Sequence, residues 1–303
     1  MRARRIIHHS QIPRGKPAGH QRSEQMNQDS TFLSGAVLKD RAKGALEGNY
    51  GKFILAALII GMITMASQAL VSFAGVMFFS MGIVFKEVMG NHLSLEQVQR
   101  LLENAVWMES YQNWYNALNY GLTLIVSLFT TVFNVGLSLY CLNLACGKKL
   151  KVSDLFYGFQ TQFGKSLKLA CVMVLVNELC YLPANIMAYL IDHNASWNLI
   201  LSAGFLYAIC LVVYVPCSLA ISQVFLLLLD FPGYSAGDLI KLSVHVMKGH
   251  KRRLFYIQLS FLPLILLGVL TFGIGNLWII PYMNITYTFF FLNLMQARER
   301  QAR

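Results

Sequence analysis

Long apolar runs recur along this chain, and short polar segments that carry most of the charge separate them. About 20 consecutive apolar residues are enough for one helix to cross the hydrocarbon core of a bilayer. The last run, residues 254–295, has 42 positions without a formal charge, which is about 63 Å of helix and requires two crossings. Gly273–Asn276 supplies turn residues between them. The six predicted spans cover residues 53–85, 117–146, 169–191, 198–229 and the two crossings within 254–295.

Three shorter segments have an amphipathic pattern and precede spans: residues 34–47, 153–166 and 234–250. Serine at the start of the first and third segments is a preferred helix N-cap. Helices of this kind lie in the headgroup layer with their cations toward anionic lipid. The chain therefore shows a faint repeat of surface helix, span and span, used three times. Either an internal triplication or similar boundary chemistry without duplication would produce it.

Composition agrees with this pattern, since 56% of the 303 residues are hydrophobic and only 13% are charged. Mean hydropathy is +0.51, and an ordinary soluble domain has about 25% charged residues. These values exclude a soluble single-core protein. The predicted fold class is all-α: a polytopic transmembrane helical bundle of about six spans, with amphipathic cytoplasmic surface helices.

The distribution of cations predicts the orientation. Of the 19 Lys and Arg residues from Met26 onward, 17 fall in alternate polar segments and two fall in residues 86–116. Cytoplasmic loops carry such an excess of cations. We therefore expect a multi-pass protein of the bacterial plasma membrane with both termini in the cytoplasm.

We divide the chain into three parts. Residues 1–33 form a basic extension that we expect to be disordered; it has no signal-peptide core, and Met26 is an alternative initiator. Residues 34–297 form the membrane domain, and residues 298–303 form a basic cytoplasmic tail.

Glu178 is the one acid deep in a predicted span, and a charged side chain at the bilayer centre is costly. Tyr181 and Asn185 share its helix face, and Pro183 interrupts the backbone hydrogen bonding of the same helix. One interpretation is a polar intramembrane site that couples to protons or cations. The other is a protonated carboxyl that hydrogen-bonds between helices and serves packing.

The basic run Lys251-Arg252-Arg253 stands at the membrane entrance of the fifth span, and we predict that it contacts anionic lipid headgroups. Gly233-Tyr-Ser235-Ala-Gly237 matches a nucleophile elbow only as a string, and we interpret Ser235 as a helix cap. The sequence contains no other catalytic pattern and no metal-ligand spacing. We therefore expect no enzyme activity, cofactor or metal. The expected partners are membrane lipids and other membrane proteins, and we expect no binding of nucleic acid.

Several ordered strings resemble a known family. They are Leu38-Lys-Asp-Arg-Ala-Lys43, Leu46-Glu-Gly-Asn-Tyr50, residues 233–243, Met247-Lys-Gly-His-Lys251, Leu270-Thr-Phe-Gly-Ile-Gly275 and Leu277-Trp-Ile-Ile-Pro-Tyr282. The chain resembles, over residues 38–295, the domain-of-unknown-function 975 family of bacterial, mainly Firmicutes, integral membrane proteins. The resemblance implies no established activity. We expect a non-enzymatic, partner-binding or membrane-organising protein; the alternative is a small-solute transporter or channel with its polar site around Glu178.

Overall fold

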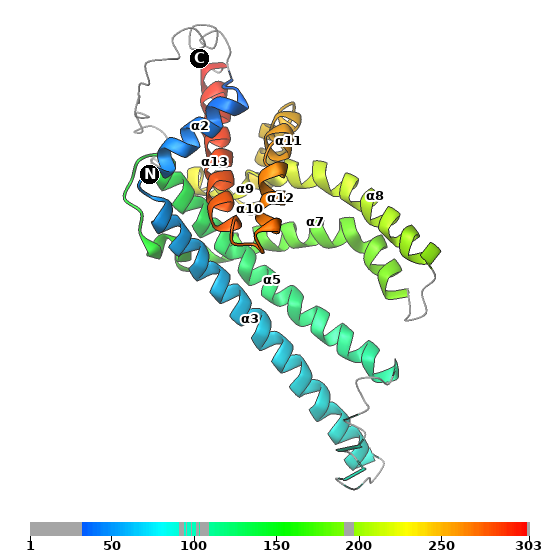
Figure 1. The fold of residues 1–303 in the computed structure, drawn as a ribbon. Helices are drawn as coiled ribbons and strands as arrows, with labels where there is room; N and C mark the ends of the chain where they lie inside the picture. The colour runs from blue at the N-terminus through cyan, green and yellow to red at the C-terminus, as the bar shows by residue number, and fades with distance from the viewer. Residues whose placement is uncertain are drawn as a thin grey trace. The chain divides into compact units, whose positions relative to one another are not determined.

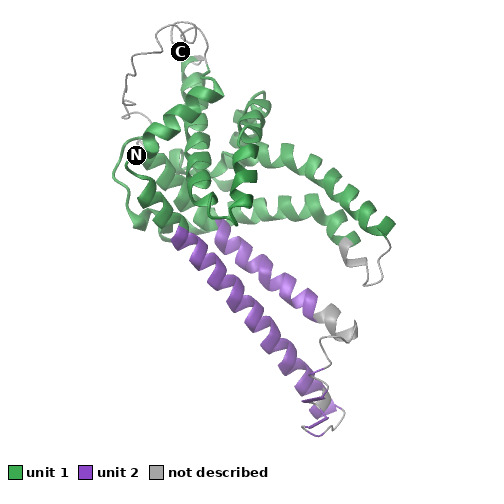
Figure 2. Ribbon diagram, viewed as in Figure 1, with its two compact units in different colours: residues 1–57, 132–303 green, residues 58–131 purple. Residues whose placement is uncertain are grey.

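The computed structural model describes residues 32–90, 109–190 and 197–301, with positions 94, 96, 97, 99, 100 and 103. It divides into two compact units, residues 1–57 with 132–303 and residues 58–131 (Figure 2). The described residues are helical and contain no strand. Residues 1–31, with the alternative start Met26, lie outside the described part of the chain.

Six helices are long and apolar enough to cross a membrane, which confirms the predicted fold class. In chain order the spans are α3 (Tyr50–Phe85), α5 (Glu109–Ala145), α7 (Phe163–Leu190), α8 (Trp197–Ile221) with α9 (Val224–Asp230), α11 (Lys251–Leu259) with α12 (Leu262–Leu270), and α13 (Asn276–Gln301). Figure 1 shows α7 and α8 running side by side. The fourth span is interrupted at Ser222 and Gln223, and the fifth at Ser260 and Phe261. A sharp turn joins α12 to α13, with Gly273 at φ 87°.

The smaller unit, residues 58–131, contains most of α3 and the first part of α5. Within it Phe79 meets Tyr115 edge to face at 5.1 Å, and Ile83 is buried in the same cluster. A π-helical turn, Lys86–Gly90, ends α3. Ser94 and Gln97 then form a reciprocal capping box, since each backbone N–H donates to the other side chain, as the sequence predicts.

Two surface helices share one register. α2 (Gly35–Leu46) and α10 (Ala236–Met247) each have 12 residues and a serine N-cap, and each is followed by a glycine with positive φ, Gly48 or Gly249. Ser34 accepts from the N–H of Val37, and Ser235 from that of Asp238. Their buried residues match at four, eight and twelve positions after the serine: Leu38, Ala42 and Leu46 in α2, and Leu239, Ser243 and Met247 in α10. The structure thus supports the first and third copies of the repeat.

The prediction of a second, continuous surface helix over residues 153–166 is wrong. A 3-10 turn, η3 (Val152–Phe156), leads into the single turn α6 (Tyr157–Gln160), and α7 begins at Phe163. Close packing of this segment on α5 explains why the helix is broken, because tertiary contacts outweigh the local helical propensity of the sequence. A Cβ added to Gly136 of α5 would lie 1.9 Å from the carbonyl oxygen of Leu155, and one added to Gly158 would lie 2.7 Å from that of Val132.

The most buried span is α13. It is 61% buried over its apolar window, whereas the other five spans are 6 to 22% buried and expose most of their apolar surface, as lipid-facing helices do. α2 packs along α13, and α10 packs on α7, α8 and α9. α10 thus lies against spans that precede it, whereas α2 lies against the last span (Figure 1).

Candidate functional site

Arg253, in the first turn of α11, joins three parts of the chain. Its Nη2 donates to the carbonyl oxygen of Leu33 and, at 3.2 Å, to Oδ1 of the buried Asn293 of α13. Its guanidinium also lies over the rings of Phe32 and Phe290, 5.1 and 5.5 Å from their centroids, which are cation–π distances. The same Asn293 oxygen accepts from the N–H of Leu33 at 3.1 Å. Residues 32 and 33, which the sequence assigns to the extension, thus belong to the packed unit.

The other two cations of the basic run point elsewhere. Lys251 Nζ donates to the carbonyl oxygen of Pro216 in α8 at 3.2 Å, whereas Arg252 is exposed. Of the three predicted headgroup contacts, Arg252 therefore has its charge most available to lipid. Lys251 and Arg253 have hydrogen bonds to protein as well.

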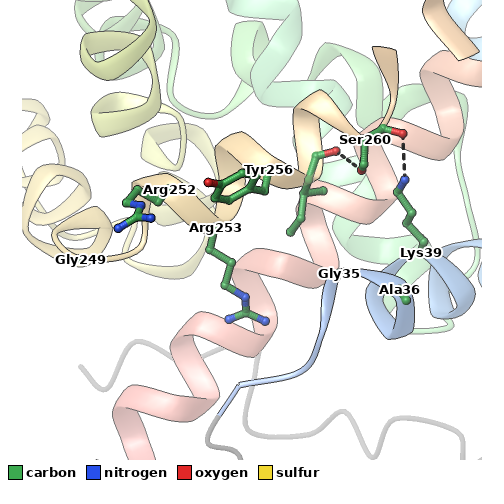
Figure 3. A pocket seen from close by; sticks show the side chains of 9 residues that line it. Gly35, Ala36, Lys39, Gly249, Arg252, Arg253, Tyr256 and Ser260 are labelled. Atoms are coloured by element: carbon green, nitrogen blue, oxygen red, sulfur yellow. Dashed lines mark hydrogen bonds between the residues drawn. The ribbon is translucent and has the colours of Figure 1, made fainter. Parts of the chain in front are cut away.

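A groove of about 680 Å³ separates α2 from α11. Lys39 lines it from α2, and Arg252, Arg253 and Tyr256 line it from α11 (Figure 3). Lys39 Nζ donates to the carbonyl oxygen of Ser260 at 3.2 Å and lies 4.2 Å from the ring centroid of Phe261. Burial and the neighbouring charge of Lys43 lower the pKa of Lys39.

The described residues that line this groove include three cations and no acid. Guanidinium and ammonium groups bind phosphate oxygens through charge-assisted hydrogen bonds. The Nη1 atom of Arg253 is buried and has no hydrogen-bond partner among the described residues. The groove thus has the charge and the donors that an anionic phosphate headgroup requires.

His250 stands at the edge of the groove, directly before α11. Its ring lies 4.7 Å from that of Phe32, and the pKa of His250 is lowered by burial and by the charges of Arg253 and Arg298. The imidazole is consequently biased toward its neutral form, and the positive charge of the groove comes from Lys39, Arg252 and Arg253.

The structure brings together only some of the residues of the predicted intramembrane site around Glu178. Glu178 and Tyr181 are half-buried and Asn185 is exposed. Glu178 accepts a hydrogen bond from Asn177 at 3.4 Å, and the Tyr181 ring lies 5.0 and 5.2 Å from those of Tyr207 and Tyr214 in α8. None of the three predicted residues lines the groove or the cavity described next.

A cavity of about 150 Å³ within the larger unit was not expected from the sequence. Its lining includes four amide side chains from different spans or span breaks: Asn134, Gln223, Gln258 and Asn284. The sequence contains one signal for this cavity, which can be recognised once the structure is known. A spacing of four places two polar residues on one helix face, as in Asn134 with Ser138 on α5 and Asn284 with Thr288 on α13.

Ser235, which matches a nucleophile elbow as a string, is a helix cap in the structure. Ser235 Oγ donates to Oδ2 of Asp238 at 2.7 Å and caps α10, which confirms the capping interpretation. The described part of the chain has no group of three His, Cys, Asp or Glu residues that could hold a metal ion.

Comparison with known proteins gives one result. The family model described as "Protein of unknown function (DUF975)" matches residues 34–298. No curated protein and no solved structure matches the chain. The match begins at the N-cap of α2 and ends near the end of α13, so it covers all six spans and the groove. The chain therefore belongs to the DUF975 family.

Proposed function

We propose that this protein is a non-enzymatic component of the bacterial plasma membrane that binds anionic lipid headgroups and thereby organises lipids or partner membrane proteins. The observation that carries the proposal is the groove between α2 and α11, whose lining contains three cations and no acid in the part of the chain that the structure describes. Juxtamembrane cations attract anionic lipid by about 1 kcal/mol each near the surface. A headgroup phosphate would also supply acceptors for the exposed guanidinium of Arg252.

Orientation is part of the proposal. The distribution of Lys and Arg supports a cytoplasmic location for α2, for the start of α11 and for both chain ends, because cytoplasmic loops carry the excess of cations. The groove would then face the inner leaflet. Reporter fusions at position 303 and within residues 91–108 test this: reporters on the same side of the membrane would overturn it.

The lipid experiment compares two double variants that remove the same charge. The first is Lys39→Gln with Arg252→Gln in the groove; the control is Lys148→Gln with Lys149→Gln, which are exposed and outside it. After purification, native mass spectrometry counts retained phosphatidylglycerol and phosphatidylcholine. We expect the groove variant to lose several-fold more phosphatidylglycerol than the control. Equal retention by the two variants would contradict the proposal.

The second candidate function is a small-solute transporter or channel. The amide-lined cavity favours it, since polar groups inside spans commonly mark solute pathways. Glu178, which lies outside the lining of this cavity, would act as the coupling group. Solute flux in reconstituted vesicles that Glu178→Ala abolishes would favour transport, and flux that this change leaves unaltered would count against Glu178.

A further inference from the structure

The cavity of about 150 Å³ lies where the fourth span is interrupted. Ser222 and Gln223 stand between α8 and α9 and form one wall, and α5, α11 and α13 supply the others. In membrane proteins, non-helical backbone at such depth is found where it is buried in protein or lines a cavity. Breaks of this kind in transporters place polar groups at a ligand site. The interruption of the fourth span therefore lies at the cavity, where its polar groups could contact a ligand.

Gln223 has an unmet hydrogen-bonding group. The residue is 2% exposed, its Nε2 donates to Ser222 Oγ at 2.9 Å, and its Oε1 is buried without a partner among the described residues. A buried acceptor without a partner is destabilising. A donor bound in the cavity would supply the missing partner.

Two hydroxyl groups on the α5 and α13 walls donate their protons to backbone carbonyl oxygens. Ser138 Oγ donates to the carbonyl oxygen of Asn134 at 2.7 Å, and Thr288 Oγ1 to that of Asn284 at 2.9 Å. Ser138 Oγ can therefore only accept a further hydrogen bond, whereas Thr288 also has a side-chain hydrogen bond with Cys141. With Oε1 of Gln223, Ser138 Oγ gives the cavity acceptors for an occupant that donates.

Donors are present as well, in the amide groups of the lining. The side chains of Gln258 and Asn284 have no hydrogen bond to another described residue, and each amide has two N–H donors and an acceptor oxygen. No carboxylate is present among the described residues that line the cavity. A cation would therefore have no counter-charge, and an apolar occupant would leave these groups unpaired.

We propose that this cavity is a binding site for a small neutral solute that both donates and accepts hydrogen bonds, of the primary-amide type. An apolar cavity of about this volume holds a benzene-sized guest, about six heavy atoms. The site is separate from the lipid groove and does not depend on it. For so few atoms the dissociation constant falls in roughly the 0.1–10 mM range.

The test uses the full chain in nanodiscs and saturation-transfer NMR with two probes of similar size. Acetamide donates and accepts, whereas acetone only accepts. One hydrogen bond to Oε1 of Gln223 corresponds to roughly a tenfold preference for acetamide. Gln223→Leu should remove this preference, and Ser138→Phe should abolish binding of both probes by filling the cavity. Gln68→Leu is the matched control, because Gln68 is an exposed amide of α3 outside the cavity.

Acetamide preference in the wild-type protein and in Gln68→Leu, with its loss in either cavity variant that folds, supports the site. Equal signals from acetamide and acetone in the wild-type protein would show that the cavity does not select a hydrogen-bond donor and would overturn the proposal. Unchanged acetamide binding in both cavity variants would overturn it too, as would displacement of acetamide by ammonium at lower concentration.

Discussion

Gly136→Ala tests the closest backbone contact that an added methyl group would meet in the structure. The added Cβ would lie 1.9 Å from the carbonyl oxygen of Leu155, whereas ordinary contacts begin at 3.4 Å. α5 and η3 would therefore have to separate by about 1.5 Å. The separation would disturb Leu155, which is fully buried, and the ring contacts of Phe133 with Phe156 and Phe159 at 5.6 and 4.7 Å.

The expected magnitude follows from two opposing effects. Overpacking of this kind costs about 3 kcal/mol, and the helical preference of alanine over glycine offsets about 1 kcal/mol. The net loss of about 2 kcal/mol corresponds to a fall in melting temperature of about 4 to 8 °C for a chain of this size. Gly158→Ala should have a smaller effect, because the added Cβ would lie 2.7 Å from its nearest backbone oxygen.

The assay is fluorescence-detected size exclusion of detergent-solubilised protein after heating. Gly204→Ala in α8 is the control, since an added Cβ there would have no atom within 4 Å beyond its chain neighbours and the adjacent backbone of its own helix, and it should melt at the wild-type temperature or slightly above. The reasoning is refuted if Gly136→Ala is as stable as Gly204→Ala, because α6 and η3 would then not depend on close approach to α5.

Three further predictions use the same melting assay. Arg253→Met should lower the free energy of unfolding by about 2 kcal/mol, because it removes hydrogen bonds from a charged group to Leu33 and Asn293. Arg253→Lys should restore little of this stability. Full restoration by lysine would show that charge alone matters. Ser235→Ala should cost about 1 kcal/mol through loss of the α10 cap, and no change would mean that the cap is dispensable. Since burial and the charges of Arg253 and Arg298 lower the folded-state pKa of His250, its contribution is present above its unfolded pKa of about 6.5 and is lost as the pH falls through the folded-state pKa. Melting below pH 6 should therefore be less pH-dependent in His250→Gln than in the wild-type protein, and an identical pH profile would contradict the assignment.

The sequence predicts the spans and their caps because these features depend on local chemistry. Length and hydropathy determine where a helix can cross lipid, and Ser34, Ser94 and Ser235 cap helices through side chains only a few residues away. The turn at Gly273 is local in the same sense.

Features that depend on contacts between distant segments could not be predicted in this way. Asn134, Gln223 and Asn284 look like scattered amides until the spans that carry them are placed together. The role of Arg253 depends on Asn293, which is 40 residues away in the chain. The break of the second surface helix depends on Gly136, whose missing side chain has meaning only beside Leu155.

The contact of α2 with α13 has a consequence for how this chain matures. The N–H of Leu33 reaches Asn293 across 260 residues, so at about 5 to 20 residues per second synthesis separates the two by roughly 13 to 50 s. During that interval the apolar stripe of Leu38, Ala42 and Leu46 has no permanent docking partner, and we expect the bilayer surface to hold it. In a nascent chain arrested before α13, this helix would stay undocked and would be susceptible to cleavage by quality-control proteases.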